Sequence, residues 1–340
     1  SGLASRQYTR PSMARFRVAP EDFLVEELPL YPPDGDGPFL WLWVEKRGLD
    51  TAQAARVIAE HCDLPRKEVG WAGRKDRHAV TRQALTVPAQ AAASLESLDR
   101  ADLAVLESRR TGERLRAGQL AGNRFVLTVR DVDGAQAATA AEGLRSIDRR
   151  GLPNRFGAQR YGRDGRNVDR GRELLEGGRV RGDRRRAFFM LSALQSQVFD
   201  EVLRRRPHDE LWAGDLAVEH RSGDWTWIDD PDAHRAALDR FDISATGPIF
   251  GTKTRRPKGR AAALEAEVMA DLGLPPVERL DPPKGLRLFG DRRALRVRPG
   301  DASSSYDAEG EAFTVRFDLP PGSYATVVLE ELFPAGLREG

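Results

Sequence analysis

The chain has 340 residues, and its 54 basic side chains against 52 acidic ones leave a net charge of +2, so any nucleic-acid contact must be local. The single cysteine, Cys62, excludes a disulfide framework and a thiolate zinc site and suits a reducing compartment. No run approaches the ~18 apolar residues of a membrane helix, so we expect a soluble cytoplasmic protein with two domains.

The first predicted elements are two strands and a helix. Arg15–Leu28 has the pattern of a strand that Pro20 interrupts, since proline cannot donate a ladder hydrogen bond. Phe39–Gly48 is apolar on both faces, which is typical of a central strand. Asp50 offers an N-cap to an alanine-rich helix over Thr51–Cys62.

The stretch GWAGRKDRHAVTRQ comes next, with four cationic side chains and one carboxylate, Asp76. We predict a short strand over Glu68–Gly73, a charged loop over Arg74–Val80 and a strand over Thr81–Pro88. A single acid among so many bases is either an ion-pair partner or a reagent.

The chain then alternates between predicted helices and strands. Residues 90–107 are predicted to be helical. Asn123–Val132 is a predicted strand with Phe125, Leu127 and Val129 on one face, and residues 134–151 form an alanine-rich helix that ends at a glycine. Strands with interspersed helices and no regular βαβ period indicate an α+β fold with a mixed, mainly antiparallel sheet.

The composition changes after residue 145. Residues 145–186 hold 14 arginines and 6 acids, and a predicted amphipathic helix follows over Ala187–Arg206. A second basic stretch, Gly251–Arg260, lies beyond it. The C-terminal stretch Ala312–Phe333 is predicted as a strand, a Pro-Gly turn and a helix that Ser323 caps.

Several kinds of chemistry are excluded by missing patterns. The sequence contains no GxxxxGK[ST] phosphate loop, no GxGxxG turn and no GxSxG elbow, and its five histidines are scattered. We therefore expect no metal and no cofactor. An ionised aspartate among cations can act as a nucleophile or general base without either, although the same residues can also be a solvated loop with weak ion pairs.

The glycine-rich segment NRFGAQRYGRDGRN, Asn154–Asn167, allows RNA contact. Arginine forks bind phosphates, and aromatic rings stack on unpaired bases. In a chain with six lysines and 48 arginines, the alternative is an ordinary solvated surface.

Six motifs in order resemble the TruD-type tRNA pseudouridine synthases. Together they cover about residues 13–333, and the similarity is weakest over about 207–300. They are PEDFLVEE, AGRKDRHAVTRQ, GNRFVLTVR, GLPNRFGAQRYG, SALQSQVFDEVLRRR and PPGSYATVVLEEL.

This resemblance implies isomerisation of a tRNA uridine, typically at position 13, to pseudouridine, with Asp76 as the reagent. It leaves open whether Asp76 attacks C1′, attacks C6 or acts as the base in a glycal route. It also implies a pseudouridine-synthase domain split over 13–153 and 304–340. An inserted α/β TRUD domain over 154–303 would form a V-shaped basic cleft with it. The target base is expected to flip out of its stack.

The resemblance assigns further residues by position. Those expected to bind the substrate are Arg17, Phe23, Gln83, Asn123, Phe125 and Tyr324, and those expected to bind RNA are Lys75, Arg77, Arg155, Arg160 and Arg163. Arg17 is also expected to hold Asp76 ionised. Phe23 and Phe125 have core packing as an alternative, and Gln83 can be a strand-surface amide.

The chain departs from the family pattern at three positions. Tyr324 stands where phenylalanine is common, Arg17 where lysine is usual, and Ala158 where glutamate is common.

Two other functions remain open on the residues alone: a non-catalytic RNA-binding module, and a cofactor-free lyase or hydrolase of a small nucleoside. We expect tRNA as the partner and a monomeric protein.

Overall fold

The computed structural model describes residues 13–178, 184–280, 286 and 288–340. Contacts divide the chain into two units, which are described separately. The first contains the chain up to Arg145 together with Pro299–Gly322 and Leu329–Gly340, and the second contains Ser146–Arg298 and Ser323–Val328. The predicted domain boundaries at 153/154 and 303/304 lie near these divisions, and the assignment of an inserted domain stays a prediction.

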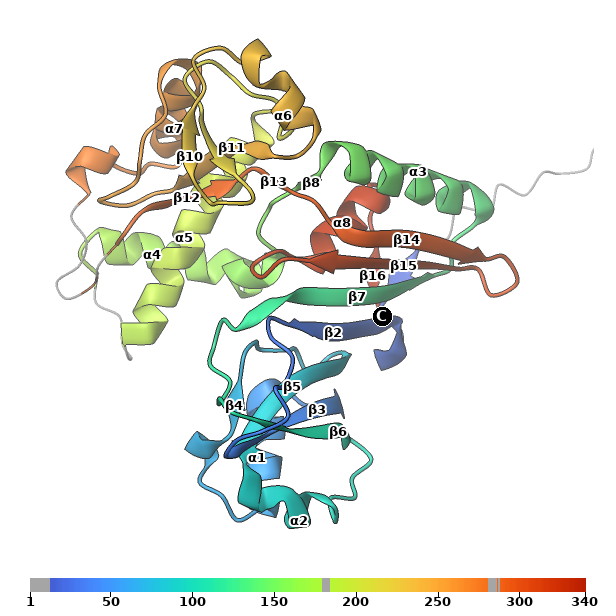
Figure 1. Ribbon diagram of the computed structural model, residues 1–340. Coiled ribbons are helices and arrows are strands. Elements are labelled where there is room, and N and C mark those ends of the chain that lie inside the picture. Colours follow the sequence, from blue (N-terminus) through green and yellow to red (C-terminus); the bar gives the residue numbers. More distant parts are fainter. Residues whose placement is uncertain (1–12, 179–183, 281–285, 287) are drawn as a thin grey trace, which may run out of the picture. The chain divides into compact units, whose positions relative to one another are not determined.

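The first unit is built on a mixed sheet (Figure 1). Its main path runs β14-β15-β7-β2-β5-β3-β6, and along it only the β2–β5 pair is parallel. The strands are β1 (Arg15–Phe16), β2 (Phe23–Pro29), β3 (Phe39–Arg47), β4 (Gly70–Trp71), β5 (Val80–Pro88), β6 (Leu103–Thr111), β7 (Leu120–Arg130), β14 (Gly300–Asp307), β15 (Ala312–Leu319) and β16 (Arg338–Glu339). The predicted α+β class with a mainly antiparallel sheet is confirmed.

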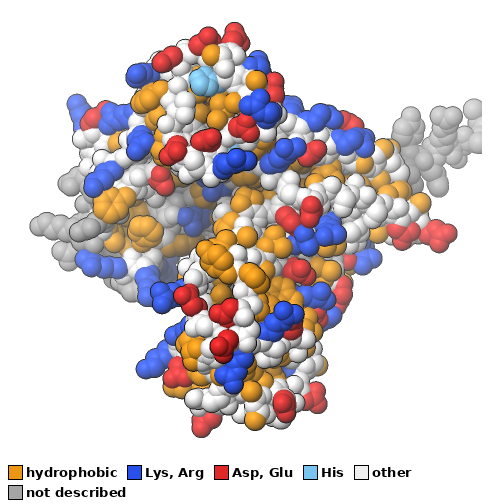
Figure 2. Space-filling model, in the orientation of Figure 1, with side chains coloured by type: hydrophobic (Ala, Val, Ile, Leu, Met, Phe, Trp, Pro, Cys, Tyr) orange, Lys and Arg blue, Asp and Glu red, His pale blue; other side chains and the backbone are white. Residues whose placement is uncertain are grey.

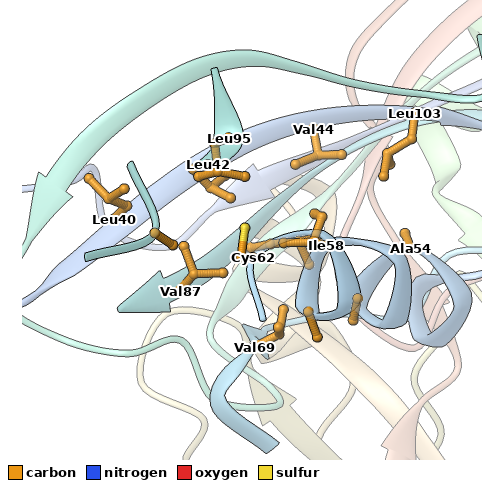
Figure 3. Close-up of a cluster of buried hydrophobic side chains, with 14 residues drawn as sticks. Leu40, Leu42, Val44, Ala54, Ile58, Cys62, Val69, Val87, Leu95 and Leu103 are labelled. Carbon is orange, nitrogen blue, oxygen red and sulfur yellow. The ribbon is translucent and has the colours of Figure 1, made fainter. Parts of the chain in front are cut away.

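Helix α1 (Thr51–His61) covers one face of this sheet. The Asp50 side chain accepts a hydrogen bond from the Gln53 amide, which confirms the predicted N-cap. Apolar side chains of α1 pack against those of β3 and β5 in a buried cluster that includes Leu42 and Ile58 (Figure 3). The predicted central strand is confirmed, because β3 pairs with β5 on one side and β6 on the other.

The helix predicted over residues 90–107 is confirmed only at its start. A 3-10 turn (Ala89–Ala91) leads into the short helix α2 (Ala92–Leu95), and β6 begins at Leu103, where helix was predicted. The side chains of Leu103 and Val105 alternate with exposed neighbours, and β6 pairs with the free edge of β3. Hydrogen bonding to that edge outweighs the helical preference of the segment.

Two further helices are divided between the two units. Helix α3 (Gly134–Arg150) ends at Gly151, as predicted, where φ is +86°. Helix α8 (Ala325–Leu332) follows the predicted Pro-Gly turn but begins two residues after Ser323, the predicted cap, whose hydroxyl donates to Asn154 Oδ1 at 3.5 Å.

The second unit combines helices with a small antiparallel sheet of order β10-β9-β11-β12. Its α5 buries the predicted apolar face, including Leu194, Val198 and Phe199. The elements are α4 (Arg166–Leu175), α5 (Arg184–Arg204), α6 (Arg235–Asp239), α7 (Gly259–Asp271), β8 (Leu152–Pro153), β9 (Leu216–Glu219), β10 (Trp225–Trp227), β11 (Ile243–Ile249), β12 (Asp291–Ala294) and β13 (Arg296–Val297). Part of the predicted arginine-rich region, residues 179–183, lies outside the described residues.

Candidate active site

Asp76 lies in the loop between β4 and β5, as predicted. Its side chain is exposed, and Oδ1 accepts a hydrogen bond of 3.2 Å from the His78 amide. An aspartate that bonds the amide two residues ahead forms a local turn, which orients the carboxylate. The reagent candidate is therefore accessible to a substrate and is fixed by its own loop.

Buried hydrogen bonds hold this loop over the sheet. The Gln83 amide donates to the Gly73 carbonyl at 3.3 Å and accepts from the Thr51 hydroxyl at 2.8 Å. That hydroxyl in turn accepts from the Lys75 amide at 2.8 Å. Gln83 is fully buried, so the predicted substrate-binding residue anchors the loop to the start of α1.

Lys75 and Glu27 form a buried ion pair below the loop. Lys75 Nζ lies 2.5 Å from Glu27 Oε2, and both side chains are almost wholly enclosed. Burial lowers the pKa of Lys75, and the Glu27 charge opposes that shift. Lys75 was predicted to bind RNA, but here its ammonium group is inside the protein, where a phosphate does not reach.

Gly73 fits closely above this ion pair. A Cβ atom at this position would lie 2.8 Å from both Glu27 Oε2 and Lys75 Nζ. Only glycine lets the backbone approach the buried pair so closely.

Lys46 is a buried cation whose role the sequence did not predict. It is 1% exposed, and its ammonium group donates to the Leu49 carbonyl at 2.5 Å and the Asp76 carbonyl at 3.4 Å. Burial, followed by the nearby Lys75 charge, lowers the pKa of Lys46 to about 8. In the sequence Lys46 stands between Glu45 and Arg47 at the end of an apolar run, so nothing distinguished it from a solvated strand end.

The strand register places these groups on one face of the sheet. Val44 of β3 is opposite Gln83 of β5, and Glu27 of β2 is opposite Asn123 of β7. Side chains two residues apart share a face, so Lys46 joins them. A row of polar groups therefore crosses the sheet beyond the apolar cluster under α1.

Two of the three predicted aromatic residues lie further along the same face. Phe23 and Phe125 are buried, with ring centroids 6.5 Å apart in an edge-to-face arrangement. Phe317, which was not among the predicted residues, stacks on Phe125 with ring centroids 5.5 Å apart. This arrangement agrees with core packing as well as with one wall of a base pocket.

Asn123 brings an unused acceptor to the polar row. Its Oδ1 atom is buried and has no hydrogen-bond partner within the described part of the chain. A buried polar atom without a partner costs free energy, so such atoms often mark a place that a ligand occupies.

Arg17 lies against Phe23. Its guanidinium is 4.3 Å from the Phe23 ring centroid and donates to Glu339 Oε1 at 2.7 Å. Its φ of +56° is uncommon for a residue with a side chain. The ion pair seen for Arg17 is thus with Glu339, and its pairing with Asp76 stays a prediction.

Arginine side chains line a groove beside the loop. The groove has a volume of about 750 Å³ and runs along β4, where Trp71, Arg74 and Arg116 contribute to its wall. The predicted RNA-binding residue Arg77 is exposed in the adjacent loop. On the face shown in Figure 2, basic (blue) and acidic (red) side chains are interspersed.

The second unit holds the other predicted residues. Phe156 packs on Tyr324 with centroids 6.1 Å apart, and a Cβ atom at Gly157 would lie 2.5 Å from the Tyr324 ring. Arg160 donates to the Ser196 hydroxyl at 3.2 Å and lies 5.6 Å from the Phe156 ring centroid. Because Tyr324 belongs to this unit, its predicted contact with the base is separate from the geometry around Asp76.

A buried carboxylate supports this part of the second unit. Asp200 accepts the Phe156 amide at 3.0 Å and the Tyr161 hydroxyl. Burial raises the pKa of Asp200 to about 6, and Arg155 is near enough to oppose that shift. The side chain of Arg163 lies outside the described part of the structure.

The described residues form neither a metal site nor a membrane span. Among the described residues, no group of three or more His, Cys, Asp or Glu side chains is arranged to hold a metal ion. Within the same part of the chain, none of the helices has the length and apolarity that spanning a bilayer requires.

Comparisons with known proteins agree with one another. A family model described as tRNA pseudouridine synthase D (TruD) matches residues 7–180 and 183–332. A tRNA pseudouridine synthase D of Geobacter metallireducens is 35% identical, with 93% of this chain and 94% of that protein aligned. One from an Anaeromyxobacter species is 40% identical, with 94% and 92% aligned. A solved structure of a Methanosarcina mazei protein that carries the TruD name matches with a TM-score of 0.74 over 95% of this chain and 94% of that one, at 21% identity.

Proposed function

This chain belongs to the tRNA pseudouridine synthase D (TruD) family, and from that membership we propose that it isomerises a uridine of tRNA, at position 13, through the carboxylate of Asp76. The family is one of isomerases that make pseudouridine in tRNA. Membership therefore favours an enzyme over the non-catalytic RNA-binding module and the small-nucleoside lyase that the residues alone left open.

The proposed reaction exchanges one bond for another. The bond between C1′ and N1 breaks, the uracil rotates, and C1′ bonds to C5. C5 then loses its proton and N1 gains one, so the product has the composition of the substrate and no oxidant or reductant is needed. The reaction starts with Asp76 acting at the junction of sugar and base, by attack on C1′ or C6 or by removal of a proton.

The anchors around Asp76 supply the orientation that this step needs. Lys46, Gln83 and the Lys75–Glu27 pair all hold the loop from within the protein. Because they use the backbone and neighbouring side chains of the loop, the carboxylate remains exposed. This combination of a rigidly held loop and an accessible carboxylate is the observation that carries the proposal.

We assign the base-binding role first to Asn123. Its free Oδ1 can accept a hydrogen bond from the N3–H of uracil. Phe23 and Phe125 are proposed to line the pocket of the flipped base. The contacts of Arg17 and Tyr324 with the base stay predictions.

Binding of the tRNA is proposed to depend on arginine. Arg77, Arg155 and Arg160 are proposed to contact phosphates, and the predicted role of Arg163 is retained without a structural account. A basic cleft that receives the tRNA, a monomeric state and a cytoplasmic location also stay predictions. Phosphate contacts would make the affinity fall steeply with salt.

Asp76→Asn tests the proposed reagent. The substitution keeps the size of the side chain and removes its charge, so we expect tRNA affinity within a few-fold of wild type and no pseudouridine in the product. Asp99→Asn, an exposed carboxylate before β6, is the matched control and should retain full activity. Pseudouridine formation by Asp76→Asn at the wild-type rate would reject the assignment.

A further inference from the structure

The basic stretch Gly251–Arg260 has no role in the proposed reaction. It carries five cations and no acid, and all five side chains are exposed: Lys253, Arg255, Arg256, Lys258 and Arg260. Arg256 pairs with Glu278. For the other four, no carboxylate partner is present among the described residues.

Each of these four cations lies over an aromatic ring instead. The distances from the charged group to the ring centroid are 5.3 Å for Lys253 over Phe289, 5.8 Å for Arg255 over Trp225, 4.6 Å for Lys258 over Trp227 and 3.8 Å for Arg260 over Trp212. Separations within about 6 Å are those of cation–π contacts. The four rings come from three separate segments, so the tertiary structure creates this alternation.

Hydrogen bonds fix the stretch at both ends. The Thr252 amide donates to the Leu288 carbonyl at 3.0 Å, and the Lys258 amide donates to the Gly214 carbonyl at 2.7 Å. The Gly214 amide donates to the Ile228 carbonyl, directly after β10. The cations are therefore held along a defined backbone beside the tryptophans of β10.

Two of the rings are exposed to solvent. Trp227 is 42% exposed and Phe289 is 50% exposed. Exposed aromatic rings beside cations that have no carboxylate partner among the described residues offer a stacking face and a positive charge side by side. They are the components of a single-strand binding platform, in which rings stack on bases and cations follow the phosphates.

We propose that Gly251–Arg260, with Trp225, Trp227 and Phe289, forms a basic–aromatic surface that binds an unpaired stretch of the tRNA. This inference rests on the proposed function for the identity of the RNA. An unpaired stretch is required because the bases of a duplex stack on one another and leave no face for a protein ring. The uncompensated positive charge favours RNA over a protein partner of ordinary composition.

Two double variants separate stacking from charge. In Trp227→Ala/Phe289→Ala, affinity for a single-stranded RNA of about 12 nucleotides should fall about 5- to 30-fold, and affinity for a duplex of the same length should hardly change. In Lys253→Gln/Lys258→Gln, the slope of log affinity against log salt should decrease by about 0.7 for each lysine. Both double variants should also show a higher KM for full-length tRNA than wild type.

Control variants show whether an effect is specific to this surface. Trp227→Phe retains a ring at this position, so its affinity for single-stranded RNA should stay close to that of wild type. Arg235→Gln removes an exposed arginine on α6, and Tyr31→Ala removes a 68% exposed ring of the first unit, and neither should alter RNA affinity. Circular dichroism of each variant checks that it is folded, and the lysine substitutions remove no packed ring.

The outcomes distinguish this inference from the proposed function. Equal losses for single-stranded and duplex RNA, or wild-type affinity in both double variants, would overturn the basic–aromatic surface. Both outcomes are measured by RNA binding, so they can be judged whether or not the protein catalyses the reaction. Absence of pseudouridine in tRNA treated with wild-type protein would instead reject the proposed function.

Discussion

Replacing Lys46 by methionine removes a buried charge that opposes folding. The pKa of Lys46 is lowered from 10.5 to about 8 by burial and by Lys75. Between these pH values the unfolded chain binds a proton that the folded chain releases, so stability rises with pH. This difference between the pKa values of Lys46 in the unfolded and folded chain corresponds to about 3 kcal/mol of unfolding free energy. Stability is reduced by the full amount below pH 8, and the loss disappears as the pH approaches 10.5.

Urea unfolding of wild type and Lys46→Met at pH 8, 9 and 10.5 measures this effect. The difference in unfolding free energy between the two proteins should move by about 3 kcal/mol in favour of wild type over that range. Lys67→Met, at an exposed lysine, should follow the wild-type curve. Parallel curves for wild type and Lys46→Met would refute the reasoning.

The same variant should also lose activity. Without the ammonium group, the Asp76 carbonyl has one donor fewer, and the loop is held less firmly. We expect pseudouridine formation at pH 7 to fall about 10- to 100-fold, the cost of small misplacements of a reacting group. A variant with full activity would show that Lys46 is not a positioning residue.

Three further predictions concern the same face of the sheet. Glu27→Gln should lower the unfolding free energy by about 3–5 kcal/mol, because the charge of Lys75 stays buried without its partner. The double variant Glu27→Gln/Lys75→Met should recover most of that loss in urea unfolding. Additive losses would contradict the pairing. Gly73→Ala should reduce kcat about tenfold, because the added Cβ would press on the Lys75–Glu27 ion pair and move the loop. A wild-type rate in a tRNA assay would show that the loop tolerates the methyl group. Asn123→Ala should lower kcat/KM about tenfold and leave the unfolding free energy within about 1 kcal/mol of wild type, because Asn123 Oδ1 makes no hydrogen bond among the described residues. A larger effect on the unfolding free energy than on kcat/KM would show that Asn123 serves stability instead of substrate binding.

Local patterns in the sequence predicted much of the fold. The Asp50 cap and the apolar face of α5 depend on residues within one helix, and both are confirmed. The loop that carries Asp76 was likewise predicted from its charge alone.

Features that depend on distant partners were not predicted. The strand from Leu103 exists because the edge of β3 is available to it, and no pattern within residues 90–107 reports that edge. The positions of Lys46 and Lys75 could not be read either. Whether a lysine is on the surface or buried depends on partners such as Glu27, which lies 48 residues before Lys75.

The pairing of β7 with β15 has a consequence for biosynthesis. Thr128 and Thr314 face each other across these strands but are 186 residues apart in the chain. At translation rates of about 5–20 residues per second, β7 leaves the ribosome roughly 10–40 s before its neighbour does. During that interval one edge of the strand that carries Asn123 is unpaired, and such an edge is a site of aggregation. The nascent chain therefore passes through a vulnerable period, and slow translation or scarce chaperones should lower the yield of active enzyme before they affect its catalytic rate.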